Sequence, residues 1–280
     1  MIAVVANPTA GKGRHAALLP ALLAQLGPHE LLPEGAGAVR AAVAGGASAV
    51  VAMGGDGTAH LALQALAGTG VPLGIVPLGT GNDLATGLGL PADPGAAVAA
   101  VLAGRTRQVD LARVDGAHGT SWYGSVLAAG FDALVNERAN RMRWPRGPMR
   151  YDLAIFAELA RLRPLRYRLV IDGEPAELDS VLLAVGNTTS YGGGMRICPG
   201  ADPADGLLDV TLGVAGRLAL ATLKPKVRGG THVTHPAVRT LRARTLEIAG
   251  PDLHCYADGE RLGPLPVTVT CEPGALTLLH

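Results

Sequence analysis

The chain has 280 residues, of which 48% are hydrophobic and 17% charged, and its formal net charge is +1. This length allows two domains of ordinary size, and the near-neutral charge gives no reason to expect nucleic-acid binding. The chain starts on an apolar stretch without a basic leader, contains no apolar run of about 18 residues and has three scattered cysteines, so we predict a soluble cytoplasmic protein.

The first hundred residues alternate between apolar strands and helices. Strands are predicted over 2–8, 49–55 and 72–79, and helices over 14–26, 39–47, 59–68 and 94–104. Continuous apolar strands between helices are typical of a parallel sheet that is covered on both faces. We therefore predict an α/β nucleotide-binding domain over residues 1–107.

The pattern changes near residue 107. Short strand-like pieces follow, separated by Gly, Asp and Pro, and one helical stretch interrupts them at about 150–162. This pattern is typical of a β-rich domain. We predict that the second domain spans residues 108–272.

Four glycine-rich loops follow predicted strands, at 7–14, 54–58, 77–83 and 187–195. Glycine lets the backbone adopt positive φ and approach an anion closely, and consecutive backbone N–H groups can surround a phosphate. Three such loops in the first domain indicate a polyphosphate ligand. The pattern is not that of a P-loop, because Ala6 and Gly13 stand where a glycine and a hydroxyl residue are required. The G-x-G-x-x-A match over 11–16 is too short to indicate a dinucleotide-binding fold.

The sequence GGDGT over 54–58 places Asp56 at a strand end between glycines. A carboxylate beside phosphates is repulsive unless a cation lies between them, and Mg²⁺ is the cation that suits this arrangement. The alternative is that Asp56 caps the helix that follows, starting at Thr58 or Ala59.

The ordered motifs NPTAGKG, GGDGT, PLGTGNDLA, AAGFDA, YGGGMRICPGADPADGLLDV and DGE resemble the diacylglycerol kinase catalytic-domain superfamily, in its soluble bacterial lipid kinase branch. The resemblance covers essentially the whole chain, and sphingosine kinases are more distant relatives. It implies a first domain like that of NAD kinases and phosphofructokinases, a C-terminal β-sandwich, and an active-site cleft between them. It also implies that the last strand, at about 273–280, returns to the first domain.

By this resemblance, the chain transfers the γ-phosphoryl group of ATP to a hydroxyl of a diacylglycerol-like lipid. The residues implied for the nucleotide and its Mg²⁺ are Asn7, Gly11, Lys12, Gly54, Gly55, Asp56, Gly57, Thr58, Thr80, Gly81, Asn82 and Asp83. Asp56 would act on the catalytic Mg²⁺, and the proton acceptor would be Glu260 or, as second choice, Asp258. For Lys12, a solvated surface lysine is the alternative.

The acidic loop over 200–209 is implied to hold a second, structural Mg²⁺. Its ligands would be Asp205 with main-chain oxygens of Asp202 and Leu207, and Asp209 would be a supporting neighbour. The alternative is a solvated acidic loop.

Two departures from the family pattern stand out. Family members commonly read GGDGT-x-N-E, whereas this chain has His60 and Leu61 in place of the polar pair. A threonine expected near the end of the second strand is also missing, since Leu32 and Pro33 occupy that place.

Arginines are concentrated in segment 138–168, at positions 138, 141, 143, 146, 150, 161, 163, 166 and 168. Aromatic and aliphatic side chains are interspersed among them, which suits docking on an anionic membrane surface. The alternative is a solvated face with internal ion pairs.

The leading prediction is thus a lipid kinase that uses ATP and Mg²⁺ in phospholipid metabolism, peripherally attached to a membrane, with a homodimer left open. One alternative is an NAD kinase or another GGDG-type kinase with a soluble acceptor. A nucleotide-binding pseudo-kinase is the other, because of the altered residues after GGDGT.

Overall fold

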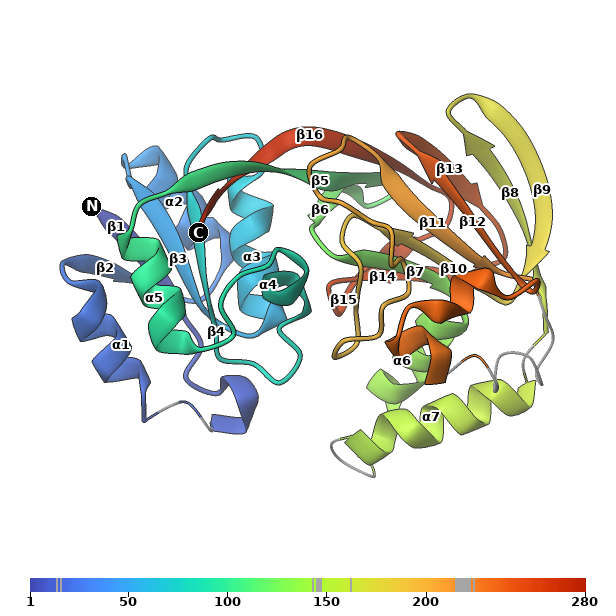
Figure 1. Ribbon diagram of the computed structural model, residues 1–280, viewed down its shortest axis with the longest axis horizontal. Coiled ribbons are helices and arrows are strands. Elements are labelled where there is room, and N and C mark those ends of the chain that lie inside the picture. Colours follow the sequence, from blue (N-terminus) through green and yellow to red (C-terminus); the bar gives the residue numbers. More distant parts are fainter. Residues whose placement is uncertain are drawn as a thin grey trace.

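The computed structural model describes residues 1–13, 15, 17–142, 144, 148–161, 163–214, 223 and 225–280, arranged as two domains side by side (Figure 1). The elements of the first domain are β1 (Ile2–Ala6), η1 (Ala10–Gly13), α1 (Leu19–Leu26), β2 (His29–Leu32), α2 (Ala36–Ala44), β3 (Ala49–Gly54), α3 (Asp56–Leu66), β4 (Leu73–Pro77), α4 (Asp83–Gly87) and α5 (Pro94–Leu102).

The first domain is a parallel sheet with a core on each face. Its strands lie in the order β2-β1-β3-β4, and all of these pairings are parallel. In β3, Val50 and Ala52 face the core shared with α2 and α3, whereas Val51 and Met53 face the core shared with α1 and α5. Both faces are therefore buried, which explains why the strands read as continuous apolar runs.

The second domain is a β-sandwich with helices packed along one side (Figure 1). Its elements are β6 (Gly119–Tyr123), β7 (Val126–Gly130), α6 (Phe131–Arg141), α7 (Pro148–Arg161), β8 (Leu165–Ile171), β9 (Glu174–Ser180), β10 (Leu182–Gly186), β11 (Leu208–Gly213), η2 (Thr231–Thr234), β12 (Val238–Ala243), β13 (Thr245–Ala249), β14 (His254–Ala257) and β15 (Glu260–Pro264). One sheet has the order β12-β11-β10-β7-β14-β15. It packs on the sheet that contains β13, β8 and β9 through buried side chains such as Leu127, Leu183 and Leu246.

Two long strands connect the domains. β5 (Thr106–Gly116) and β16 (Val267–Leu279) pair antiparallel along nearly their whole length and run from one domain to the other (Figure 1). At its start β16 pairs with β13 of the sandwich, and near its end Leu278 pairs in parallel with Leu73 of β4. The two domains are consequently parts of one continuous sheet system.

The predicted fold class is confirmed: an α/β domain with a parallel sheet is followed by a β-sandwich. Some predicted elements were wrong in detail. The helix predicted over 14–26 is described only as α1 from residue 19, where Pro20 provides a helix start, and residues 14 and 16 lie outside the described residues. Helix α6 was missed, because β7 passes directly into it at Gly130. No helix in the described part of the chain is long and apolar enough to cross a membrane.

Candidate active site

The GGDGT turn connects β3 to α3 and packs against the turn that follows β4. A Cβ on Gly54 would lie 2.3 Å from Thr58 Oγ1, and a Cβ on Gly79 would lie 2.6 Å from the Cα of Gly55. These distances leave no room for a side chain. The motif predicts glycines for close approach of phosphates; at Gly54 the Thr58 side chain, and at Gly79 the backbone of the facing turn, already require a glycine.

Asp56 is the first residue of α3 and is half-buried. Its Oδ1 accepts a hydrogen bond from Leu84 N–H (3.1 Å), so it caps α4 and not its own helix. Burial raises the pKa of Asp56, and the nearby carboxylates of Asp83 and Asp258 raise it further. A carboxylate held against like charges at the edge of the sheet is a place that a cation would stabilise.

The turn over 77–83 forms the opposite wall. Asn82 has φ of 55° and its side chain accepts from Gly79 N–H (2.9 Å) and donates to Gly79 O (3.1 Å). Asn82 therefore holds the turn itself. Thr80 is exposed, and both Asp56 Oδ2 and Asp83 Oδ2 border the space beside Gly81.

Asp83 connects the two domains. Its carboxylate accepts hydrogen bonds from Gly193 N–H (2.7 Å) and Gly194 N–H (2.9 Å). These glycines belong to the fourth glycine-rich loop and both have positive φ. The loop thus binds a carboxylate of the first domain through consecutive N–H groups, a geometry that the glycine-rich sequence predicts for a phosphate.

The D-G-E turn lies between β14 and β15 and brings its two carboxylates into different surroundings. The Asp258 side chain is 0% exposed, and its oxygens accept from Ser125 N–H (2.9 Å), Gly124 N–H (3.0 Å) and His60 Nδ1 (3.2 Å). Glu260 is exposed, and its Oε1 would lie 3.4 Å from a Cβ on Gly57. Glu260 consequently faces the first turn of α3 across the cleft.

A cavity of about 660 Å³ opens between the domains. It is lined by Asn7, Ala10, Glu34, Ala36, Gly55, Gly57, Thr58, His60, Leu61, Gln64, Ser121, Glu260, Arg261 and Leu262. Of the predicted nucleotide residues, Asn7, Gly55, Gly57 and Thr58 line this cavity. Gly11 packs beneath Leu78, where a Cβ would lie 2.5 Å from Leu78 O, and the side chain of Lys12 lies outside what the structure describes.

Several cavity residues carry no sequence motif and were not predicted. Glu34 follows β2 and its Oε1 accepts from Asn7 Nδ2 (3.2 Å), near where the expected threonine is absent. Ser121 and Gln64 come from β6 and α3, and no motif marks them. The position of Glu34 after a strand end was the one signal in the sequence that pointed to it.

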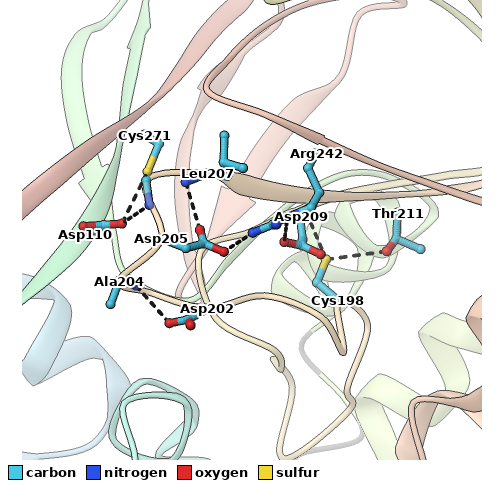
Figure 2. A network of polar contacts seen from close by, with 11 residues as sticks. Asp110, Cys198, Asp202, Ala204, Asp205, Leu207, Asp209, Thr211, Arg242 and Cys271 are labelled. Atoms are coloured by element: carbon cyan, nitrogen blue, oxygen red, sulfur yellow. Dashed lines mark hydrogen bonds and ion pairs between the residues drawn. The ribbon is translucent and has the colours of Figure 1, made fainter.

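The acidic loop over 200–209 is tied to Arg242 (Figure 2). One oxygen of Asp205 accepts from Leu207 N–H (3.0 Å), and the other pairs with the Arg242 guanidinium, which also contacts Asp209 (3.2 Å). Asp202 caps its own turn by accepting from Ala204 N–H (3.1 Å). Both Asp205 oxygens are thus engaged, so a cation would have to displace Arg242. The structural Mg²⁺ stays a prediction.

A further carboxylate, Asp110, contacts this loop and is buried. Asp110 is 4% exposed, and its oxygens accept from Gly206 N–H (2.7 Å) and Gly274 N–H (2.8 Å). It joins β5 to the acidic loop and to the turn within β16, close to Cys271 (Figure 2). This residue was not singled out from the sequence, because an aspartate inside a strand carries no motif.

The arginine-rich segment includes the end of α6, α7 and the start of β8, and both helices lie along the lower side of the sandwich in Figure 1. Arg138 pairs with Glu158, and Arg141 with Glu137 (2.7 Å), so part of the positive charge is compensated. Trp144 is 79% exposed. Exposed apolar side chains also include Met149 and Leu153 on α7. Arg143 and Arg146 lie outside the described residues, as does the side chain of Arg150.

The fold and the cleft define a class: a two-domain phosphotransferase in which glycine-rich turns of an α/β domain face a sandwich that contributes a carboxylate. Comparison with known proteins gives the family. Residues 1–114 match the diacylglycerol kinase catalytic domain, and residues 125–280 match the YegS C-terminal NAD kinase beta sandwich-like domain. The chain belongs to this diacylglycerol kinase and YegS-like lipid kinase family, and it is a lipid kinase.

Individual relatives agree with this assignment. The chain is 51% identical over 244 residues to the diacylglycerol kinase of Mycobacterium tuberculosis, covering 86% of this chain and 79% of the relative. It is 34% identical over 253 residues to a YegS-like lipid kinase of Stenotrophomonas maltophilia, covering 86% and 81%. A diacylglycerol kinase structure from Bacillus anthracis has a TM-score of 0.77 at 22% identity, covering 100% of this chain and 96% of the other. An NAD kinase from Archaeoglobus fulgidus in complex with ATP shares the fold at a TM-score of 0.55 and 15% identity, covering 100% and 94%.

Proposed function

We propose that this lipid kinase transfers the γ-phosphoryl group of ATP to a hydroxyl of a diacylglycerol-like membrane lipid, in the presence of Mg²⁺. The observation that supports this most directly is the opposition of Asp56 and Glu260 across the cleft. Asp56 lies in the phosphate-binding turn as the first residue of α3, and Glu260, at the start of β15 in the other domain, faces the next residue, Gly57. Phosphoryl transfer needs this combination of charge neutralisation and a base for the acceptor hydroxyl.

The nucleotide would bind along the cavity between the β1, β2 and β3 turns. Asn7 and Glu34 provide polar groups in its lining, and Gly55 and Gly57 line it without side chains. The start of α3 adds exposed N–H groups and the positive end of its dipole. These features favour a polyphosphate whose terminal group points toward Gly57.

Mg²⁺ would be held by Asp56, with Asp83 close by. Oxygen ligands suit this cation, and repulsion from neighbouring carboxylates already disfavours ionised Asp56. No group of three His, Cys, Asp or Glu side chains that could hold a metal forms among the described residues, so phosphates and water would complete the coordination. When bound, the ion would neutralise charge on the phosphates.

Glu260 is our proposed proton acceptor, in preference to Asp258. Its side chain is exposed in the cavity, whereas every Asp258 oxygen already accepts an N–H group. The acceptor hydroxyl would attack the γ-phosphorus as the bond to the β,γ-bridging oxygen breaks. The hydroxyl proton would pass to Glu260, and ADP would leave with the electron pair of the broken bond.

The lipid would reach the cleft from a membrane surface. We infer peripheral attachment at the cytoplasmic face through the arginine-rich segment, with Trp144 and Met149 entering the headgroup region. Cosedimentation with vesicles tests this: anionic vesicles should retain the protein, neutral vesicles should not, and Trp144→Ser should weaken retention. Equal retention on both vesicle types would contradict the proposed attachment.

Size-exclusion chromatography with light scattering would decide whether the protein is a dimer.

Phosphoryl transfer is tested with labelled ATP and Mg²⁺. Purified protein is incubated with mixed micelles that contain diacylglycerol or, in parallel, with NAD. Label in the lipid phase, lost with EDTA and in Asp56→Ala, is the expected result. Label in NAD and not in lipid would support the soluble-acceptor alternative. Nucleotide binding without transfer to any acceptor would support the pseudo-kinase alternative.

A further inference from the structure

His60 departs from the family pattern, yet it is almost completely buried and lies at the centre of a polar network. It is the fifth residue of α3 and is 8% exposed. Its Nδ1 lies 3.2 Å from Asp258 Oδ2, and its Nε2 lies 3.2 Å from Gln64 Nε2. The ring thus joins the helix that begins at Asp56 to the D-G-E turn of the other domain.

The neighbours of His60 determine where its proton lies. Gln64 Oε1 accepts from Trp122 N–H (3.1 Å), and Gln64 Nε2 donates to Trp122 O. This pair of backbone bonds fixes the amide orientation, so the Gln64 atom that faces His60 is an N–H donor. Nε2 of His60 must then be an acceptor, and the proton of the neutral ring must be on Nδ1. From there it is donated to Asp258.

This arrangement leaves neither ring nitrogen available for substrate chemistry. Nδ1–H is used by Asp258, and the lone pair of Nε2 is used by Gln64. His60 therefore cannot serve as the general base in this geometry, although it lines the cavity beside Glu260.

The hydrogen bond from His60 to Asp258 also affects the position of Glu260, because both carboxylates belong to the D-G-E turn. Asp258 and Gly259 have φ of 53° and 85°, and they form the two-residue connection between β14 and β15. Two consecutive positive φ angles are the signature of a tight type I′ hairpin turn. Because Glu260 follows immediately, fixing the Asp258 carboxylate fixes the backbone that carries Glu260.

We propose that His60 is a positioning residue: its Nδ1–H bond to Asp258 sets the D-G-E turn against α3, so that Glu260 faces the phosphate-binding turn. The proposal rests on the proposed function of Glu260 as proton acceptor. It also explains how this chain can work without the polar pair at 60 and 61. His60 supplies a bond between the domains, and Leu61 supplies only an apolar wall of the cavity.

Two substitutions separate the hydrogen bond from simple packing. In His60→Asn the amide nitrogen can take the place of Nδ1 and donate to Asp258, whereas His60→Leu keeps a side chain of comparable bulk without a donor. At saturating ATP and lipid, we expect kcat of His60→Leu to fall about 10- to 100-fold, the loss typical of a buried bond to a charged group. His60→Asn should retain kcat within about threefold. An Asn variant as impaired as the Leu variant, or a Leu variant as active as wild type, overturns the proposal.

The protonation state can be tested without any substitution. Nitrogen-15 NMR of the wild-type chain, labelled in histidine, should show His60 protonated at Nδ1 and unprotonated at Nε2; His60→Asn serves to assign the resonance. Protonation at Nε2 overturns the proposal, and it does so even if the Leu variant does not fold. If wild type transfers no phosphate to lipid, the proposed function fails. The NMR result then shows separately whether the bond between the domains exists.

Discussion

Replacing Asp56 by asparagine should abolish phosphoryl transfer and at the same time stabilise the metal-free protein. Asp56 Oδ2 and Asp83 Oδ2 lie 2.8 and 3.3 Å from the same point, the position of a Cβ on Gly81, so the two oxygens are no more than about 6 Å apart. Asp258 adds further repulsion, and burial adds a desolvation cost. In the absence of a cation, ionised Asp56 opposes folding.

The magnitude follows from this separation. Two unit charges about 6 Å apart repel by about 3 kcal/mol at an effective dielectric constant of about 20. Because Asp83 is partly exposed and its charge is shared with two N–H donors, screening reduces this to about 1–2 kcal/mol. The neutral asparagine would also accept more weakly from Leu84 N–H, which offsets about 0.5 kcal/mol. We expect a net gain of about 1 kcal/mol in the free energy of unfolding.

The pH dependence of the free energy of unfolding tests independently whether Asp56→Asn is more stable than wild type. The pKa of Asp56 is raised in the folded state, mainly by burial, so the fold favours the protonated carboxyl group. Wild type therefore loses stability as the pH rises from the ordinary value of 3.8 through the folded-state pKa. The asparagine side chain does not titrate, so the advantage of Asp56→Asn should be present at neutral pH and disappear below pH 3.8.

Urea unfolding of both proteins, at low salt with EDTA and at both pH values, measures this difference. Asp93→Asn is a matched control, because it removes one charge while an asparagine can keep the N-cap bond to Ala96 N–H. Added Mg²⁺ should stabilise wild type and not the Asp56 variant. An Asp56→Asn protein that is less stable than wild type at neutral pH without metal would refute the reasoning, and so would one that still transfers phosphate.

Two further substitutions test other buried carboxylates. Burial raises the pKa of Asp132 to about 6, although a hydrogen bond from Tyr191 acts in the opposite direction. The free energy of unfolding of wild type should therefore fall by up to about 3 kcal/mol between about pH 4 and pH 8, and that of Asp132→Asn should not. Parallel pH profiles of urea stability for the two proteins would contradict this prediction. Asp110→Asn should lower the free energy of unfolding by about 2–4 kcal/mol, because the new amide N–H group would face one of the two N–H donors that now bind the carboxylate. As a control, Asp202→Asn at an exposed position should change it by less than about 0.5 kcal/mol. If Asp110→Asn and Asp202→Asn had equal effects on stability, Asp110 would not be important for connecting β5 to the acidic loop.

The fold was predictable where local pattern determines it. β1, β3 and β4 are apolar because both faces are buried, so they stand out in the sequence. α6 was not predictable in this way, since no polar turn separates it from β7. Gly130 makes the change of direction with φ of 124°, and in sequence it reads as one glycine within an apolar run.

The site was predictable in its motifs and not in its connections. GGDGT directed attention to Asp56 because the motif is local and distinctive, whereas D-G-E reads as an ordinary hairpin turn and Glu260 followed only from the family resemblance. The contacts that bring them together join residues distant in sequence: His60 to Asp258, and Asp83 to the glycine-rich loop at 193–194. The donors to Asp83 are backbone N–H groups, which no residue type reveals.

The departure from the family pattern at position 60 shows why such contacts between distant residues matter for function. Judged by residue type, a histidine where the family pattern has a polar pair weakened the case for catalysis and kept the pseudo-kinase alternative open. In the fold, the same histidine donates to a carboxylate of the other domain and is held in one orientation by Gln64. A residue that departs from the motif can therefore supply a hydrogen bond between the domains. If the proposed role of His60 is right, the placement of Glu260 opposite the phosphate-binding turn rests on this contact with Asp258, and not on agreement with the motif.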